Sequence, residues 1–560
     1  MAWSRSPSSS SGATEEWQRP LGESEFAFHS FSHTGVGDMF LHLSFLAPPT
    51  LLNPQRVQLA WAALLLRHPL LLSSVHVHAN DELAPSPSFR FVPPTNVQEL
   101  LVAAQKRLIF SKCTKNEFVH QYMNGSPRIV GDDTICHLTI AQSQSSTDAC
   151  RSAHAVPGLF PAGVNGHVSP SQSQDDVSRP PSTPDNRSSY DLFLCAPHFS
   201  GDALPLHQSA HDLLALLAAP RSLDALEHEL QALAGQWDWR LPYPVEALLP
   251  PPPSSRLARA AAQVNYLQSQ AREVGGHVLP RQQRGPMRTV LLERGFTPEQ
   301  TKRILARCKK QGVSANHAVF ALVDVAWANM LETGFDLPIM NYTALSLRPY
   351  LTYPSAQLEK QMSYWFVALT YFNIVLPSFL PVTCAEHFPA STFWERARAA
   401  RDQIAGITRS RFLIHRARMM GAQRAERAGW KPVPAPPAVP MPSEDGIPVQ
   451  SHLPLLPPSS DALTAISPRK EPVPSKALMG ISLMGNLDKV YLADQYPDIK
   501  LLDVATASRQ KAGGILFLAH TFAGRMWLHM AYDENGFEEG SMERFWDEVG
   551  RAADAMFIGQ

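Results

Sequence analysis

The chain of 560 residues is 44% hydrophobic, enough to bury a large core in one big unit or in two ordinary domains. Its 49 Lys and Arg residues nearly balance its 50 Asp and Glu residues, and the formal charge of −1 argues against a general DNA- or RNA-binding protein. The 49 prolines exceed the usual share, so we expect long irregular connections between the folded elements.

The composition also predicts where the protein works. The six cysteines are widely spaced and form no C-x-x-C pair, which indicates reduced thiols rather than a zinc site or a disulfide framework. The Ser-rich beginning has no apolar stretch typical of a secretion signal, and no apolar run reaches the roughly 18 residues that a membrane span needs. We therefore expect a cytoplasmic monomer without a membrane segment, a nucleic-acid partner or a bound metal.

Stretches without regular apolar spacing divide the chain. They are a disordered tail at 1–15, a disordered insertion at 142–189, a linker with a four-proline run at 241–285, and a Pro-rich insertion at 431–476. The sequence thus predicts an N-terminal lobe over 16–240 and a C-terminal lobe over 286–560.

The N-terminal lobe alternates helical and strand-like patterns. Apolar residues recur at helical spacing over 54–67, behind a Pro at the start, and this predicts a helix. Residues 73–78 alternate like a strand, and the apolar runs 134–141 and 190–196 predict two more strands on either side of the insertion.

The C-terminal lobe opens with a clear helix start at Thr297, which is followed by a Pro and forms a capping box with Gln300. Gly312 ends that helix, and Ser314 begins a second one over 315–331. This second helix is apolar on most faces, so we expect it to be buried.

Strand-like runs over 340–347 and 511–533 complete the pattern. Two successive sets of strand and helix signals, separated by the Pro-rich linker, predict an α/β fold of two lobes. We expect each lobe to be a mixed β-sheet flanked by helices, with the active centre at the interface between the lobes.

One segment places residues that can do chemistry between a strand and a helix. The strand over 190–196 delivers His198 to its C-terminal end, the turn HFSGD follows, and an apolar-periodic helix begins after Asp202. Strand ends are common places for reactive groups, because a side chain there is rigid and can face a cleft. An imidazole at this place could remove a proton from a hydroxyl group at neutral pH, and Asp202 could fold back to fix the loop.

Two other histidine patterns are interpreted as structural. His529 and Asp533 have the same H-x-x-x-D spacing, but they lie in a strand-like alternation with no helix start behind it. His207 and His211 share one helix face at a metal-ligand spacing, but no third ligand accompanies them, so we expect no metal site.

The HFSGD turn resembles the H-x-x-x-D motif of the condensation-domain and BAHD superfamily of CoA-dependent acyltransferases. Other segments are similar to this superfamily and follow in its order: R-P-L-G at 19–22 with Glu25, R-H-P-L-L at 67–71, G-V-S-A-N at 312–316 and N-Y-T-A-L-S-L-R-P at 341–349. The group that the chain resembles most is that of fungal secondary-metabolite O-acetyltransferases, either trichothecene 15-O-acetyltransferase-like or glycolipid acetyltransferase-like.

The resemblance implies a two-lobed chloramphenicol-acetyltransferase-like fold with the active site between the lobes. It also implies that acyl-CoA, above all acetyl-CoA, is a co-substrate rather than a bound cofactor. His198 would be the general base on a hydroxyl group of a hydrophobic acceptor, a glycolipid or a terpenoid. Asp202 and Arg348 would support the catalytic loop, and Ser482 would lie near the thioester oxygen.

Two positions depart from the family pattern. Pro197 precedes His198 where many condensation domains carry a second histidine, and Leu483 stands where the family's S-N-x-G element has Asn. Two other functions stay open beside acyl transfer from CoA. One is a stand-alone condensation-type enzyme that uses carrier-bound acyl groups, and the other is a non-catalytic binding scaffold of the same fold.

Overall fold

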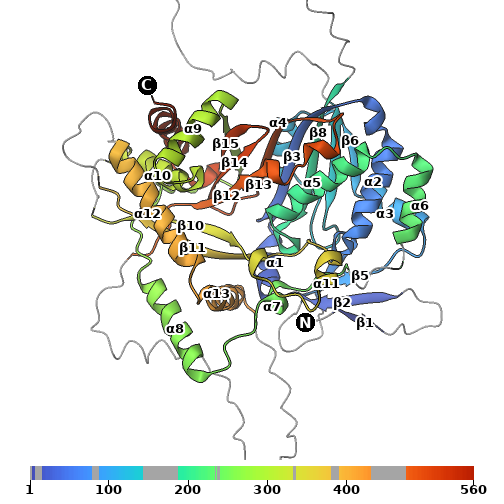
Figure 1. Cartoon of the computed structure of the whole chain (residues 1–560), viewed down its shortest axis with the longest axis horizontal. Coiled ribbons are helices and arrows are strands. Elements are labelled where there is room, and N and C mark those ends of the chain that lie inside the picture. The colour runs from blue at the N-terminus through green and yellow to red at the C-terminus, as the bar shows by residue number, and fades with distance from the viewer. Residues whose placement is uncertain are drawn as a thin grey trace, which may run out of the picture.

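Two mixed β-sheets, each covered by helices, organise the chain into an N-terminal and a C-terminal lobe (Figure 1). The structure is a computed structural model that describes residues 3–6, 15–77, 87–142, 187–233, 235, 240–331, 336–379, 390–430 and 474–559. The predicted two-lobed α/β fold is confirmed. Most of the tail predicted at 1–15 and of the insertions predicted at 142–189 and 431–476 lies outside the described residues.

The N-terminal lobe is built on a five-stranded sheet and a smaller antiparallel sheet. Its strands are β1 (Ser4–Ser6), β2 (Glu16–Pro20), β3 (Asp38–Ala47), β4 (Ser74–Val77), β5 (Pro87–Phe91), β6 (Leu108–Ser111), β7 (His137–Gln142) and β8 (Ser188–Pro197). Its helices are α1 (Glu23–Ser32), α2 (Pro54–Arg67), α3 (Val97–Gln105), α4 (Lys115–Asn124), α5 (Ala203–Ala218) and α6 (Leu223–Leu233).

The C-terminal half supplies a six-stranded sheet and its own helices. Its strands are β9 (Thr289–Gly295), β10 (Ile339–Ser346), β11 (Leu369–Leu376), β12 (Gly480–Asn486), β13 (Lys500–Ser508), β14 (Ile515–Phe522) and β15 (Arg525–Asp533). Its helices are α9 (Pro298–Lys310), α10 (Ala315–Ala328), α11 (Ala356–Gln361), α12 (Ala390–Thr408), α13 (Leu413–Arg427) and α15 (Ser541–Ala553). Among the described residues, no helix combines the length and the apolar character that crossing a bilayer requires.

Strand β13 crosses from the second half of the chain into the sheet of the first. The order of the five-stranded sheet is β13-β3-β8-β7-β6, with β13 antiparallel to β3, and that of the six-stranded sheet is β11-β10-β12-β14-β15-β9. The core of the N-terminal lobe accordingly includes Trp365, Tyr491 and Val504. The boundary expected at 16–240 is therefore too narrow, because the edge of that lobe's sheet is closed by a strand from the other half of the sequence.

Two segments expected to be irregular contain regular structure. The linker predicted at 241–285 includes helices α7 (Val245–Leu248) and α8 (Arg256–Ala271), although the proline run between them is coil. Within the tail predicted at 1–15, β1 pairs with β2 in an antiparallel ladder. Short polar segments of this kind gain order from partners elsewhere in the fold, and their local sequence does not predict this.

Local signals nevertheless set the ends of several helices correctly. Helix α2 has the predicted bounds, and the Asn53 side chain caps it by accepting from backbone amides of its first turn. Helix α9 begins with the predicted capping box of Thr297 and Gln300. Helix α10 follows Ser314 as predicted, is buried along most of its length, and ends slightly earlier than expected.

Buried histidines make the stability of this fold depend on pH. Burial lowers the pKa of His68 and His207 to about 3 and that of His137 to about 4. Because each of these folded pKa values lies below the unfolded value of about 6.5, unfolding takes up protons as the pH falls below that value. Burial also raises the pKa of Glu23 and Asp324 to about 7, so these two carboxyl groups oppose the histidines down to about pH 4.5.

We predict that the free energy of unfolding changes little between about pH 7 and 5. Below about pH 4.5 it should fall by up to about 4 kcal/mol per pH unit, because three histidine protons are then no longer opposed. Urea unfolding near pH 7, 5.5 and 4 measures this dependence. The variant His137→Gln should reduce the slope by about 1.4 kcal/mol per pH unit. A free energy of unfolding that rises between about pH 5 and 4 would contradict the assignment.

Candidate active site

His198 lies at the C-terminal end of β8, a central strand of the five-stranded sheet. Its backbone amide donates to the Gly37 carbonyl at 3.0 Å, which ties the loop to the neighbouring strand β3. The loop then passes close to Trp365, because a Cβ atom added at Gly201 would lie only 3.0 Å from that ring. The HFSGD turn is therefore held on one side by its own lobe and on the other by a segment from the second half of the chain.

The imidazole of His198 is half-buried and held in the neutral state. Phe28 of α1 stacks flat on it, with ring centroids 3.9 Å apart and an angle of 9° between the rings. Desolvation by burial lowers the pKa of His198, and the charge of Arg424 lowers it further, whereas the backbone at His198 and Gly201 and the Asp202 carboxylate act in the opposite direction. Its Nδ1 atom is buried without a hydrogen-bond partner among the described residues. A neutral imidazole is the form that can accept a proton.

Asp202 points away from the imidazole and joins the two lobes. One carboxylate oxygen caps α5 by accepting from the Leu204 amide at 3.2 Å. The other accepts from the Arg348 guanidinium at 2.9 Å and from the Ala368 amide at 3.0 Å. The contact expected between Asp202 and Arg348 is thus present. Because Asp202 is 3% exposed and its oxygens are all engaged, the geometry favours an architectural role over proton transfer.

A second buried ion pair places the helix that covers His198. Arg19 binds the Glu25 carboxylate with two hydrogen bonds, of 2.8 and 2.9 Å, and both side chains are almost completely buried. Glu25 also accepts from the Gly22 amide at 2.7 Å, which fixes the start of α1. These are the residues of the R-P-L-G…E segment, and the helix they anchor carries Phe28 onto the imidazole.

The sequence gave no indication of two further residues beside His198. Arg424 of α13 lies against the rings of Phe28 and Tyr371, and Tyr371 comes from β11. A cavity of about 10 Å³, room for about one water molecule, lies next to these side chains. Phe28, Tyr371 and Arg424 are far apart in the chain and belong to no spaced motif, so only the assembled lobes bring them together.

The other residues singled out in the sequence lie elsewhere. Ser482 is half-buried on β12 of the six-stranded sheet, and within the described part of the chain no hydrogen bond joins it to His198. His207 is held by two hydroxyl groups, with Nδ1 3.0 Å from Tyr491 and Nε2 3.1 Å from Thr506. His211 contacts a tyrosine hydroxyl in the same way, at 3.3 Å. No cluster of His, Cys, Asp and Glu side chains suited to a metal occurs in the described segments.

The second H-x-x-x-D match occupies a structural position. His529 is fully buried on β15, where its ring stacks on that of His520 at 5.1 Å. Asp533 at the end of the strand accepts from the backbone amides of Arg288 and Gly513, at 2.8 and 2.9 Å. These contacts fix a strand end, and no helix begins after it at the spacing that follows His198.

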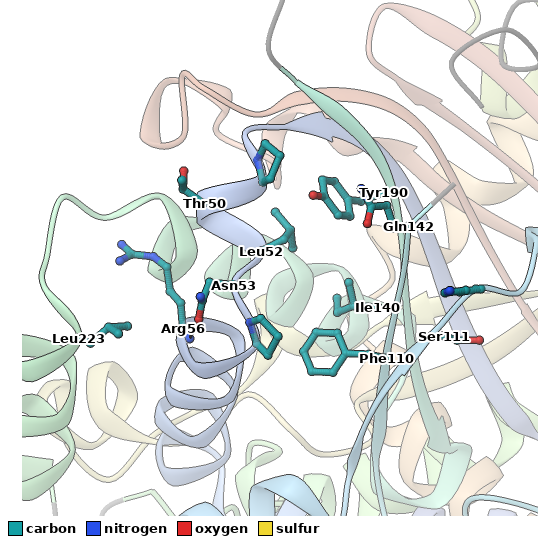
Figure 2. A pocket seen from close by; sticks show the side chains of 13 residues that line it. Thr50, Leu52, Asn53, Arg56, Phe110, Ser111, Ile140, Gln142, Tyr190 and Leu223 are labelled. Atoms are coloured by element: carbon teal, nitrogen blue, oxygen red, sulfur yellow. Dashed lines mark hydrogen bonds between the residues drawn. The ribbon is translucent and has the colours of Figure 1, made fainter. Parts of the chain in front are cut away.

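A much larger cavity, of about 820 Å³, lies away from His198 (Figure 2). Its walls include Leu52, Phe110, Ile140 and Tyr190, which close it with apolar surface. Tyr190 is near the beginning of β8 and His198 follows the end of that strand, so about 25 Å separates them. This cavity is therefore not part of the candidate active site.

Comparison with known proteins bears on the fold. No family model and no curated protein matches the sequence. The chain is similar to the structure of trichothecene 15-O-acetyltransferase from Fusarium sporotrichioides, with a TM-score of 0.66 and 12% identity over 100% of this chain and 97% of that one. It is also similar to the condensation domain of the monacolin K polyketide synthase (TM-score 0.53, 11% identity, 97% of each chain).

A third similar structure is the epimerization domain from the third module of tyrocidine synthetase B, with a TM-score of 0.52 and 10% identity over 98% of this chain and 99% of that one. At these identities the likenesses show the fold alone. That fold is the two-lobed one that the resemblance in the sequence implied, and it is shared by an O-acetyltransferase and by domains of peptide and polyketide synthases.

Proposed function

We propose that the protein is an O-acyltransferase that moves an acetyl or other acyl group from acyl-CoA to a hydroxyl group of a hydrophobic metabolite, a glycolipid or a terpenoid. The observation that carries this proposal is a neutral imidazole, that of His198, held at the meeting point of two lobes. Its loop is anchored by the pair Asp202–Arg348, and its pKa is lowered by burial. Such a group is suited to take a proton from an alcohol at neutral pH.

In the proposed reaction, the acceptor hydroxyl gives its proton to Nε2 of His198, because Nδ1 is enclosed by protein. The alcohol oxygen attacks the thioester carbonyl, and the carbon–sulfur bond breaks when the tetrahedral intermediate collapses. The imidazolium then returns the proton to the departing CoA thiolate. The hydroxyl group of Ser482 is the donor we expect beside the oxyanion, and no acyl-enzyme is needed.

A stand-alone condensation-type reaction is the second candidate, because the fold is also that of a condensation domain. The same His198 would then act on a carrier-bound amine rather than on a free alcohol. The two functions differ in donor and acceptor, so they are separable by assay. A non-catalytic scaffold would show no turnover that depends on His198.

A panel of substrates tests the proposal. Purified protein is incubated with acetyl-CoA or longer acyl-CoAs and a set of hydroxylated terpenoids and glycolipids, and the products are read by mass spectrometry. We expect one acceptor to gain the mass of one acyl group while one free thiol is released for each ester formed. Acylation of carrier-bound amines alone would favour the condensation-type function, and turnover that persists without His198 would overturn the proposed role of that residue.

A further inference from the structure

Arg424 is fixed beside the candidate base by aromatic side chains from both lobes. Its Cζ atom lies 4.2 Å from the centroid of the Tyr371 ring and 5.2 Å from that of the Phe28 ring. Phe28 in turn lies flat on His198, with 3.9 Å between the ring centroids. The four side chains form a continuous stack, and contacts of a cation with ring faces on two sides hold a guanidinium in place.

The charge of Arg424 has no counterion. Within the described part of the chain, no carboxylate forms an ion pair with it. Asp202 is the acidic residue of the His198 loop, and its oxygens are occupied by Leu204, Arg348 and the backbone that follows Phe366. A substrate next to the imidazole therefore meets the field of Arg424, whereas the negative charge of Asp202 is already paired.

We propose that Arg424 is a specificity-determining residue whose fixed positive charge keeps protonated amines out of the acceptor position beside His198 and so restricts acyl transfer to hydroxyl groups. This inference rests on the function proposed above and names its acceptor class. It also provides a physical distinction between an ester-forming enzyme and an amide-forming one that share the same fold.

The physical basis is the difference in charge between the two acceptors. A primary amine has a pKa of about 10, so at neutral pH almost all of it is ammonium, whereas an alcohol is uncharged. Two unit charges about 6 Å apart in a protein site with an effective dielectric constant of about 20 repel one another enough to change a rate by about a hundredfold. An amine must also lose its proton before it attacks, and a nearby cation favours that loss only after the amine has entered.

The test uses an alcohol and an amine with the same carbon skeleton, 2-phenylethanol and 2-phenylethylamine. Thiol release from acetyl-CoA and the acylated product are measured at about pH 7 for the wild type, Arg424→Gln and Arg424→Lys. We expect the wild type to prefer the alcohol. The Gln variant, which is polar but uncharged, should lose at least about tenfold of the preference in kcat/KM, and the Lys variant should keep it.

Water as acceptor gives a second readout that needs no alcohol. The acid limb of acetyl-CoA hydrolysis that depends on His198 should move to higher pH in Arg424→Gln, because a cation that disfavours the imidazolium is gone, and should stay in place in Arg424→Lys. An unchanged alcohol-to-amine ratio in Arg424→Gln, or equal use of both acceptors by the wild type, would overturn the inference while leaving acyl transfer intact. A wild type without any thiol release that depends on His198 would instead contradict the proposed function itself, and this inference with it.

Discussion

Replacing His198 with Ala should lower kcat for acyl transfer by about 10²- to 10⁴-fold, because the acceptor hydroxyl then has no base to take its proton. Binding of acyl-CoA should change little, so the loss should appear in kcat rather than in KM. Steady-state thiol release from acetyl-CoA measures both constants. A suitable control is His228→Ala, since His228 is exposed on α6 and contacts none of the side chains around His198.

The pH profile gives the same prediction a second form. Burial and Arg424 lower the pKa of His198, so the imidazole stays neutral below its usual value of 6.5. The rate should therefore hold as the pH falls through 6.5 and decline only at lower pH. An acid limb above that value, or activity of His198→Ala within tenfold of the wild type, would show that another group is the base.

Replacing Asp202 with Ala should cost about 3–5 kcal/mol of unfolding free energy, since the change leaves the Arg348 guanidinium buried without its charge partner. It also removes the cap of α5 and leaves the Ala368 amide unpaired. Denaturant unfolding of the wild type and the variant measures the difference.

Asp202→Asn separates the structural role of this residue from a chemical one. The amide keeps one oxygen for a hydrogen bond but loses the charge, so we expect a lower melting temperature together with nearly unchanged KM for acyl-CoA. Arg348→Gln is the matched control, because it uncouples the same pair from the other side and should show a similar loss of stability. A variant of Asp202 that keeps full stability and loses only kcat would place this carboxylate in the chemistry.

Much of the fold could be predicted because its signals are local. The capping box at Thr297, the apolar spacing over 54–67 and the strand that leads to His198 each occupy one short stretch, and the structure has helices and a strand there. The position of β13 could not be predicted in the same way. Its pairing with β3 depends on a ladder between segments more than four hundred residues apart, and no local pattern records such a pairing.

The candidate site divides along the same line. His198 and Asp202 stand in one turn, and Arg348 belongs to a motif that the resemblance supplied. Phe28 and Arg424 come from two helices that face the imidazole only after the lobes have packed together. A stacked ring and a cation without a counterion leave no spacing in the sequence, because any helix position on the right face could carry them.

Labelled acetyl-CoA mixed with a hydroxylated terpenoid or glycolipid shows directly whether His198 moves an acyl group to a hydroxyl group. The wild type and His198→Ala are compared in single-turnover reactions, and the label is followed by chromatography. We predict that the wild type transfers the label to the lipid as an ester and that the variant, folded as the wild type is, leaves it on CoA. Equal labelling of the lipid by both proteins, or label that appears only in carrier-bound amides, would contradict acyl transfer from CoA by His198.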